Sequence, residues 1–229
     1  MAALVTASPN YHVILSSRSA DKGKKAISEI QARKPVGTVS YLQLDVTNSD
    51  SIAAAVKSVE ADFGRLDVLV NNAGIVDQNP DLATQLRNTF ETNVIGATVV
   101  AYSFVPLLQK SSDPRIIHVS SGLGSIALAD DPTFPFYNVP AGAYRMSKAA
   151  LDMMGVTTQK EFSKWGCKSW VLCPGYVVTN LTGEEDREDR IKNGALSSET
   201  SADTIKRVIG GERDADVGKF VHKDGVYPW

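Results

Sequence analysis

The feature that most constrains this chain is a regular alternation of short apolar runs with longer amphipathic segments. The runs are rich in β-branched residues and lack strict polar alternation, which is typical of parallel strands buried on both faces. Strands that alternate with helices predict a doubly wound parallel α/β sheet with right-handed crossovers. The expected strands are residues 12–15, 39–42, 66–70, 115–119 and 169–172.

The segments between these runs carry apolar residues at helical spacing. One stripe is formed by Ile52, Val56, Val59 and Phe63, and a longer one runs from Leu86 to Leu108. There is no internal repeat or low-complexity linker, and 229 residues suffice to bury a core. We therefore expect one domain, residues 1–229.

Composition narrows the class of partner. The formal net charge is −2, with acidic and basic residues mixed, so nothing indicates binding of nucleic acid or of an anionic membrane. Two cysteines, Cys167 and Cys173, make neither a disulfide framework nor, without a histidine cluster, a zinc site. No apolar run is as long as a membrane span, and the N-terminus does not resemble a signal peptide. We expect a cytoplasmic protein with a small-molecule substrate and no metal; its oligomeric state stays open.

Polar residues follow several of the expected strands, where ligands of such sheets bind. After the third strand comes Asn71-Asn72-Ala73-Gly74, whose small residues would let backbone approach a flat ligand, although a plain turn fits equally. After the fourth comes Ser120-Ser121. A hydroxyl there could bind a substrate carbonyl or cap the next segment, and the sequence favours neither.

Tyr144 and Lys148 open a segment of helical character. Residues four apart lie on one helix face, so the phenol and the ammonium would be neighbours. A nearby cation favours phenolate, and we therefore expect the pKa of Tyr144 to be lowered into a range useful for acid–base chemistry.

The order of these motifs is more specific than any one of them. From about His12 to the C-terminus, the chain resembles the short-chain dehydrogenase/reductase family. This resemblance implies a Rossmann-like domain that reduces a carbonyl, or oxidises an alcohol, of a small organic substrate by hydride transfer. The motifs are Asn71-Asn72-Ala73-Gly74, Asn93, Ser120-Ser121, Tyr144 with Lys148, and Pro174-Gly175.

The resemblance also implies catalytic roles. Tyr144 would donate the proton to the carbonyl oxygen, and Ser121, the second serine of its pair, would hydrogen-bond that oxygen. Lys148 would lower the pKa of Tyr144 and hold the ribose hydroxyls. Asn93 would hold a water that links Lys148 to solvent.

The same resemblance implies the cofactor contacts. Asp45 and Val46 would contact adenine. An arginine at the end of the second family strand accommodates the 2′-phosphate of NADP, where an acidic residue would bind NAD, so Arg18 favours NADP. A solvated surface arginine is the alternative. Besides Tyr144 and Lys148, the remaining expected cofactor residues are Asn72, Ala73 and Gly74 at the adenine ribose, and Pro174, Gly175, Val177 and Thr179 at the nicotinamide.

The chain departs from the family at its start. The family's first strand ends in a glycine-rich turn whose amides hold the pyrophosphate, whereas no glycine precedes His12. Residues 1–8 could be the remnant of the first helix, which we favour because residues 8–10 resemble a turn, or residues 3–6 could be the first strand. Either way, the two strands flanking the lost one should close up or leave a slot.

This departure leaves three interpretations of function open. The chain could be an active NADP-dependent reductase, a catalytically impaired relic that binds a protein or small molecule, or an incomplete gene model of an active reductase. Intact Ser121, Tyr144 and Lys148 favour an enzyme, and the absent phosphate turn favours a relic.

Two further segments bear on the substrate. Tyr144 follows Ser121 by 23 positions, about ten more than the family minimum, and the extra Pro- and aromatic-rich stretch lies around residues 130–136. It would form part of the substrate-pocket wall or cover the helix face used for dimers. The charged stretch at residues 183–190 would be a mobile lid or, equally, a solvated helix or loop.

Overall fold

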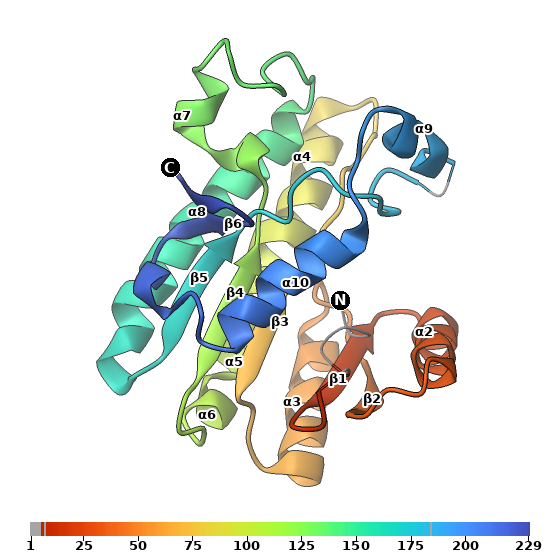
Figure 1. The fold of residues 1–229 in the computed structure, drawn as a ribbon, viewed down its shortest axis with the longest axis vertical. Coiled ribbons are helices and arrows are strands. Elements are labelled where there is room, and N and C mark those ends of the chain that lie inside the picture. The colour runs from red at the N-terminus through yellow and green to blue at the C-terminus, as the bar shows by residue number, and fades with distance from the viewer. Residues whose placement is uncertain (1–5, 7, 184) are drawn as a thin grey trace.

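The computed structural model describes residue 6 and residues 8–183 and 185–229. They form an α/β fold with two sheets (Figure 1). The larger sheet has the order β3-β4-β5-β6-β7, and the smaller one pairs β1 with β2. The strands are β1 (His12–Ser17), β2 (Thr38–Gln43), β3 (Val68–Asn71), β4 (Arg115–Val119), β5 (Lys168–Leu172), β6 (Phe220–His222) and β7 (Gly225–Tyr227).

All five strands expected from the apolar runs are present, and the pairs β1·β2, β3·β4 and β4·β5 are parallel, as predicted. Strand β4, an inner strand of the larger sheet, is buried at every position. Strands β6 and β7 were not predicted; β6 pairs with β5 in parallel and β7 returns antiparallel to it. The doubly wound parallel α/β class is therefore confirmed.

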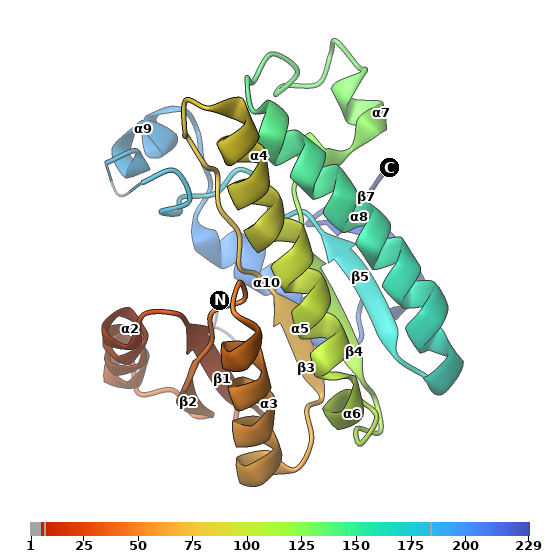
Figure 2. The ribbon, with the colours of Figure 1, turned by 180° about the vertical axis from the view of Figure 1, so that it is seen from behind.

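Helices cover both faces of the larger sheet. Helices α4, α5 and α8 lie on one face, as the view from behind shows, and α10 crosses the other (Figures 1 and 2). The α-helices are α2 (Ala20–Ala32), α3 (Ser49–Phe63), α4 (Leu82–Phe90), α5 (Ala97–Ser103), α6 (Val105–Leu108), α7 (Ile126–Ala129), α8 (Gly142–Phe162), α9 (Arg187–Lys192) and α10 (Ser198–Ile209). The shorter helical turns are η1 (Glu91–Gly96), η2 (Gly122–Gly124), η3 (Ser163–Trp165) and η4 (Asp214–Asp216).

The stripe from Leu86 to Leu108 is not one uniform helix. A π-helical segment, η1, separates α4 from α5, and α6 starts afresh after Phe104 with Pro106 in its first turn. Proline fits the first turn of a helix because it has no N–H to leave unpaired there. Apolar spacing alone could not place these breaks, since the same stripe of buried residues runs through them.

The position of α8 is fixed by close packing on the larger sheet. A Cβ at Gly155 would lie 2.2 Å from Cγ2 of Val171 in β5, so only glycine allows this approach. On the opposite face, Trp170 and Leu172 of β5 pack with Ile205 and Val208 of α10. The helix that carries the Tyr144 and Lys148 motif is thus set against the most buried part of the fold.

The smaller sheet forms a separate lobe with α2 (Figure 1). Strand β1 pairs with β2, and no strand of the described chain lies between β1 and β3. Of the two outcomes expected there, the structure has the slot: a cavity of about 330 Å³ is lined from both sheets. We call it the inter-sheet cavity. The two interpretations of residues 1–8 fall mainly on residues 1–5 and 7, which lie outside the described residues.

Candidate active site

Helix α8 delivers two of the predicted catalytic side chains to one cavity. Tyr144 and Lys148 lie on the same face, are buried, and line a cavity of about 980 Å³ that we call the catalytic cavity. The Lys148 Nζ lies 5.6 Å from the centroid of the Tyr144 ring and donates a hydrogen bond of 2.8 Å to the carbonyl of Val119, the last residue of β4. The predicted neighbourhood of phenol and ammonium is therefore present.

The pKa of Tyr144 moves in the direction opposite to our expectation. Burial raises it to about 12, and the nearby Ser121 hydroxyl and the charge of Arg190 oppose this rise only in part. Burial also lowers the pKa of Lys148 to about 8. The free energy lost by moving a phenolate out of water exceeds the stabilisation that these neighbours provide. The Tyr144 phenol is therefore expected to be protonated at neutral pH.

Ser121 has the capping role, one of the two that the sequence left open, and its hydroxyl also lines the catalytic cavity. Its Oγ accepts the N–H of Leu123 at 3.2 Å and so caps η2. A hydroxyl that accepts one hydrogen bond still has a hydrogen to donate. Ser121 lines the catalytic cavity within hydrogen-bonding reach of the Tyr144 phenol.

Asn93 lies behind the cavity, fully buried in the π-helical segment η1. Its amide accepts from the N–H of Ile75 at 2.8 Å and donates to the Ile75 carbonyl at 3.0 Å and to the Ser147 Oγ at 3.0 Å. It therefore ties the loop after β3 to α8. The Asn93 Oδ1 and the Lys148 Nζ lie 3.4 and 3.6 Å from the position of a Cβ at Gly74, so this loop passes directly beside them.

Cys173 joins the two loops that border the site. Its side chain is buried, and its Sγ accepts the N–H groups of Gly122 at 3.2 Å and of Gly175 at 3.4 Å. The thiol thus fixes the loop after β4 against the loop after β5.

The expected cofactor residues divide between two adjoining cavities. Asn72 and Gly74 line both of them, which makes the cavities contiguous along the carboxyl ends of the strands. The inter-sheet cavity also contains Arg18, Asp45, Val46 and Ala73. The catalytic cavity also contains Pro174, Gly175, Val177 and Thr179.

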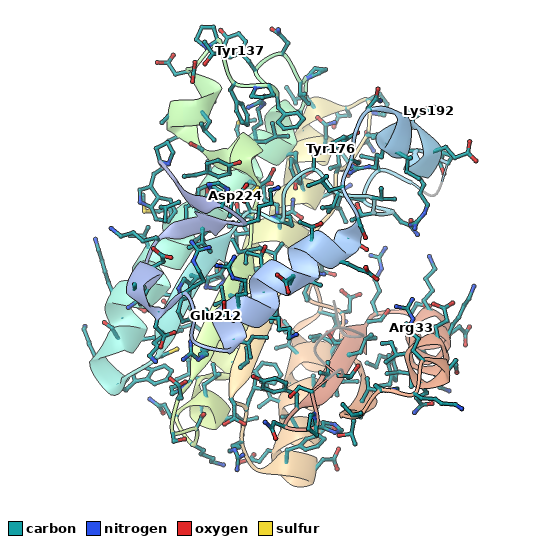
Figure 3. The ribbon with its side chains drawn as sticks, viewed as in Figure 1. Arg33, Tyr137, Tyr176, Lys192, Glu212 and Asp224 are labelled. Atoms are coloured by element: carbon teal, nitrogen blue, oxygen red, sulfur yellow. The ribbon has the colours of Figure 1, made fainter. Side chains whose placement is uncertain are left out.

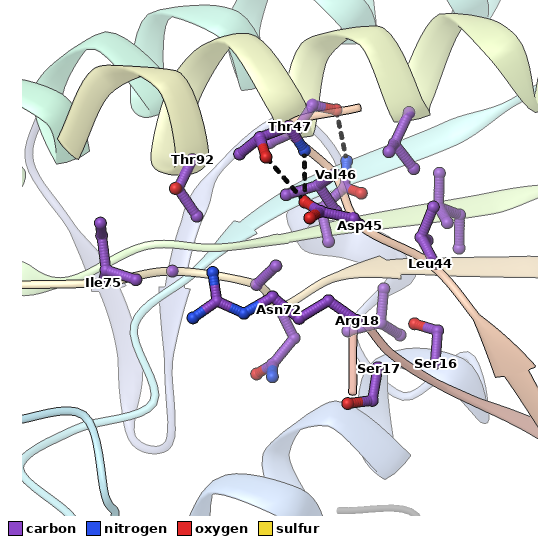
Figure 4. Close-up of a pocket in the computed structure, with 17 residues that line it drawn as sticks. Ser16, Ser17, Arg18, Leu44, Asp45, Val46, Thr47, Asn72, Ile75 and Thr92 are labelled. Carbon is purple, nitrogen blue, oxygen red and sulfur yellow. Dashed lines mark hydrogen bonds between the residues drawn. The ribbon is translucent and has the colours of Figure 1, made fainter. Parts of the chain in front are cut away.

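Arg18 crosses the mouth of the inter-sheet cavity, with its guanidinium directed past Asn72 toward Ile75 (Figure 4). Within the described chain, no hydrogen bond or ion pair holds this guanidinium. Asp45 accepts hydrogen bonds from the Thr47 N–H and hydroxyl, which lower its pKa, and the charge of Arg18 adds to this effect. Arg18 is thus the cation of this cavity that has no fixed partner among the described residues.

Comparisons with known proteins identify the family. The family model for short chain dehydrogenase matches residues 1–190. This chain belongs to the short-chain dehydrogenase/reductase family. The resemblance seen in the motifs is therefore confirmed, and with it the assignment of the chain as an oxidoreductase.

Individual relatives and structures agree. The chain is 34% identical to the short-chain dehydrogenase/reductase tropE of Talaromyces stipitatus, over 97% of this chain and 89% of that protein. It is 29% identical to human 3-keto-steroid reductase/17-beta-hydroxysteroid dehydrogenase 7, over 75% of this chain and 59% of that protein. The crystal structure of NADPH-bound carbonyl reductase from chicken fatty liver matches with a TM-score of 0.77 and 25% identity, covering 95% of this chain and 87% of that one.

Sequence reasoning missed Asp152, which lies one helical turn beyond Lys148. Its side chain is 5% exposed, and neither carboxylate oxygen has a hydrogen-bond partner within the described chain. Burial raises the pKa of Asp152 to about 7, while the Ser120 hydroxyl and the charge of Lys148 pull it down. The i, i+4 spacing after Lys148 was the available signal, since it places the carboxylate on the same face as the motif.

The Pro- and aromatic-rich stretch lies at the catalytic cavity. Phe134, Phe136 and Val139 are among the lining residues, which supports the pocket-wall alternative. Residues 187–190 of the charged stretch belong to the short helix α9, residues 183, 185 and 186 precede it, and residue 184 lies outside the described residues. Arg190 of α9 reaches the same cavity and lies 5.4 Å from the centroid of the Tyr176 ring. Whether α9 moves as a lid stays a prediction.

None of the helices described is both long and apolar enough to cross a membrane. No group of three or more potential metal ligands is assembled within the part of the chain that the structure describes.

Proposed function

We propose that this short-chain dehydrogenase/reductase is an NADP-dependent reductase of carbonyl groups. One observation carries the proposal: Ser121, Tyr144 and Lys148 meet in one cavity, with a protonated phenol beside a hydroxyl that has a free hydrogen. Two donors that converge on one point suit a carbonyl oxygen, which gains negative charge as it is reduced.

Each of these residues has a distinct task. Tyr144 hydrogen-bonds the carbonyl oxygen and passes its proton to that atom, while Ser121 donates a second hydrogen bond and fixes the orientation. The ammonium of Lys148 lies beside the phenol and stabilises the phenolate left behind. Asn93 holds the adjoining loop in place, and its proposed link through water to Lys148 belongs to the same hypothesis.

The pKa values suit reduction at neutral pH. With a pKa of about 12, Tyr144 is protonated at neutral pH and is ready to act as an acid. Oxidation of an alcohol would need the phenolate, which burial disfavours. The Lys148 pKa of about 8 keeps the ammonium charged below that pH, so reduction should be supported at neutral pH and weaken above about pH 8.

The residues present fit the two ends of a nicotinamide dinucleotide. Gly74 leaves room beside Asn93 and Lys148, and the two contiguous cavities offer one place for each end. Asp45 and Val46 would face the adenine, Asn72, Ala73 and Gly74 its ribose, and Lys148 the nicotinamide ribose. Pro174, Gly175, Val177 and Thr179 would border the nicotinamide, which, when bound, supplies the hydride. No glycine-rich phosphate turn is found within the described residues, so we assign no group to the pyrophosphate.

The preference for NADP rests on Arg18. Its guanidinium crosses the inter-sheet cavity without a fixed partner and could pair with a 2′-phosphate (Figure 4). The NADPH-bound state of the similar chicken carbonyl reductase supports this choice. A purely binding protein is not favoured, because such a protein would have no need for the three converging catalytic groups.

The test measures whether the 229-residue chain reduces a panel of small aldehydes and ketones. The reaction is monitored by the decrease in NADPH absorbance. Millimolar NADPH should be used, to offset weak phosphate binding. We expect turnover by the parent chain and a loss of at least about a thousand-fold in Tyr144→Phe, with NADPH binding retained in a fluorescence titration. Tyr137→Phe, a similar change at a 41% exposed tyrosine, is the control. Near-normal turnover in Tyr144→Phe, or none in the parent, would refute the proposal.

A further inference from the structure

The catalytic cavity carries information about the substrate beyond the carbonyl group. We propose that the substrate is a planar aromatic ketone whose ring system packs against the side chains of Phe134 and Tyr227, beside Gly122. The proposal rests on the proposed reductase function. We call Phe134 and Tyr227 the ring pair.

The ring pair lies beside the catalytic serine. From the position of a Cβ at Gly122, both the Phe134 Cζ and the Tyr227 Cε2 are 3.5 Å away, and Gly122 directly follows Ser121. Both rings are only partly buried and both line the catalytic cavity. A substrate carbonyl held by Ser121 and Tyr144 would therefore place the group attached to it against these two rings.

The two rings come from segments more than ninety positions apart, and each is fixed in place. The segment of Phe134 is held by Arg145, whose guanidinium donates to the carbonyls of Phe136, Tyr137 and Val139. Tyr227 stacks on His222 with centroids 4.1 Å apart and meets Phe220 edge to face at 5.6 Å. Rings that are held by such contacts lose less conformational freedom when a ligand binds than unconstrained side chains would.

The aromatic wall continues outward from the ring pair. Phe134 meets Phe136 edge to face at 5.5 Å, and Phe136 lies 5.7 Å from Tyr176. Arg190 covers Tyr176, and its guanidinium donates to the Val177 carbonyl at 3.1 Å. Four rings thus lie along one wall of a cavity of about 980 Å³. This volume must also admit the nicotinamide, and it leaves space for a substrate of two or more fused rings.

This arrangement selects flat rings over puckered ones. Aromatic rings attract each other in offset or edge-to-face contacts, and this attraction adds to ordinary burial of apolar surface. A saturated ring system of the same skeleton is thicker and lacks the charge distribution that these contacts use. Gly122 is buried, and a Cβ at this position would contact Phe134, Tyr227 and the Cδ1 of Leu128 at 3.5–3.8 Å, so glycine keeps the edge of the ring pair uncrowded.

A matched pair of ketones tests the idea: 2-acetylnaphthalene and 2-acetyldecalin share one carbon skeleton, flat in the first and puckered in the second. We expect kcat/KM at least about ten-fold higher for the naphthyl ketone. Conjugation makes that ketone intrinsically harder to reduce, so a preference for it must come from binding. Equal kcat/KM for the two ketones, or a higher value for the decalin, would overturn the aromatic assignment. If the chain reduces neither ketone and no other carbonyl compound, the proposed reductase function itself is refuted.

Variants locate the preference. Phe134→Leu and Tyr227→Leu should each reduce the naphthyl-to-decalin ratio several-fold, whereas Tyr137→Leu, at an exposed tyrosine on the same loop, should leave it unchanged (Figure 3). Gly122→Ala is a variant that should still fold, because its added Cβ would make only ordinary contacts of 3.5 Å with the two rings. The same Cβ would narrow the space beside the ring pair. Because the decalin is thicker than the naphthalene, this variant should lower decalin turnover more than naphthyl turnover and so raise the naphthyl-to-decalin ratio. An unchanged ratio in all three would overturn the proposal.

Binding provides a readout that does not depend on turnover. Equilibrium dialysis of the two corresponding alcohols against Tyr144→Phe, with NADP present, should show tighter binding of the naphthyl alcohol. The same dialysis with Tyr144→Phe/Phe134→Leu should bring the two dissociation constants together. Equal binding to Tyr144→Phe itself would contradict the proposed ring contacts even if both ketones were reduced.

Discussion

The two sheets of this molecule are built from similar apolar runs but differ in how deeply they are buried. Every residue of β4 is buried, and in β5 only Lys168 is not. In β1 and β2 no residue is fully buried. The same kind of strand sequence thus gives a core strand where helices cover both faces, and a half-exposed strand in the smaller lobe.

The difference has a functional side. The proposed catalytic groups Ser121, Tyr144 and Lys148 stand on or beside the buried sheet, whereas Arg18, the residue proposed to select NADP, follows β1 of the exposed sheet. The proposed chemistry, which depends on precise placement, is thus located in the more deeply buried region. Cofactor selection depends on how well the smaller lobe holds its position across the inter-sheet cavity.

The largest effect should separate the two sheets by stability. Trp170→Ala in β5 removes a fully buried side chain and should lower the free energy of unfolding by about 3–5 kcal/mol. Ile14→Ala in β1 removes a partly buried one and should cost less than about 2 kcal/mol. Urea denaturation followed by circular dichroism measures both. Equal losses would mean that the lobe is as firmly packed as the larger sheet.

The next effect concerns cofactor choice in the smaller lobe. Arg18→Asp exchanges a cation for an anion beside the expected 2′-phosphate and should weaken NADPH binding by at least about ten-fold, while NADH binding changes little or improves. Fluorescence titration of both cofactors gives the ratio. Arg33→Asp, on the same lobe but outside the cavity lining, is the control for net charge. Equal NADPH and NADH affinities in the parent chain would argue against Arg18 as the selector.

A smaller effect is expected for the response of the melting temperature to cofactor. A ligand stabilises a protein only when its concentration is well above its dissociation constant. Without a phosphate turn among the described residues, micromolar NADPH should raise the melting temperature of the 229-residue chain by less than about 1 °C. A differential scanning measurement that shows a rise of several degrees would mean that other groups hold the phosphates and that the two sheets are bridged by the cofactor.

The smallest effect is a shift in the pH dependence of kcat/KM, and it concerns the candidate active site beside the larger sheet. The charge of Asp152 raises the pKa of Lys148, so Asp152→Asn should lower that pKa below about 8. The ammonium would then be lost at lower pH, and the alkaline fall in reductase kcat/KM should move to lower pH. Asp189→Asn, at an exposed carboxylate on α9, should leave the profile unchanged. The other groups that face this site are Tyr144, whose pKa is about 12, and Cys173, whose thiol pKa is raised by burial.

Should the profile of Asp152→Asn coincide with that of the parent, Asp152 would have only a packing role. The variant keeps the size of the side chain and removes its charge, so a change in KM alone would point to altered substrate contacts instead. A shift of the alkaline limb in kcat/KM is the signature that packing cannot produce.

The larger architecture could be predicted because it depends on local pattern. Apolar runs located the first five strands, helical spacing placed Tyr144 beside Lys148, and the resemblance carried by the order of the motifs implied that Ser121 joins them. Strands β6 and β7 escaped because three residues each carry too little pattern, and their pairing is set by contacts such as Tyr227 with Phe220. No local signal could have indicated that pairing.

The sign of the Tyr144 pKa could not be predicted for a related reason. The i, i+4 spacing correctly placed Lys148 beside it, but the effect of burial depends on residues brought in from other strands and loops. Asp152 was overlooked although its spacing from Lys148 was visible, because a carboxylate on a helix usually faces solvent. Only the packed structure shows that it lies buried and without hydrogen-bond partners inside the described chain.

The π-helical segment that contains Asn93 has a consequence for comparing sequences. Such a segment holds one residue more per turn than its α-helical neighbours, so the side chains after it are rotated by about 100° relative to an uninterrupted helix. A homologue lacking that one residue would align well on both sides of a single gap. Such a homologue could direct Asn93 toward Ile75, or it could direct Ala97 and Ala101 into the core. It could not do both in the present geometry. One insertion or deletion here would therefore matter more than several substitutions elsewhere on the helix.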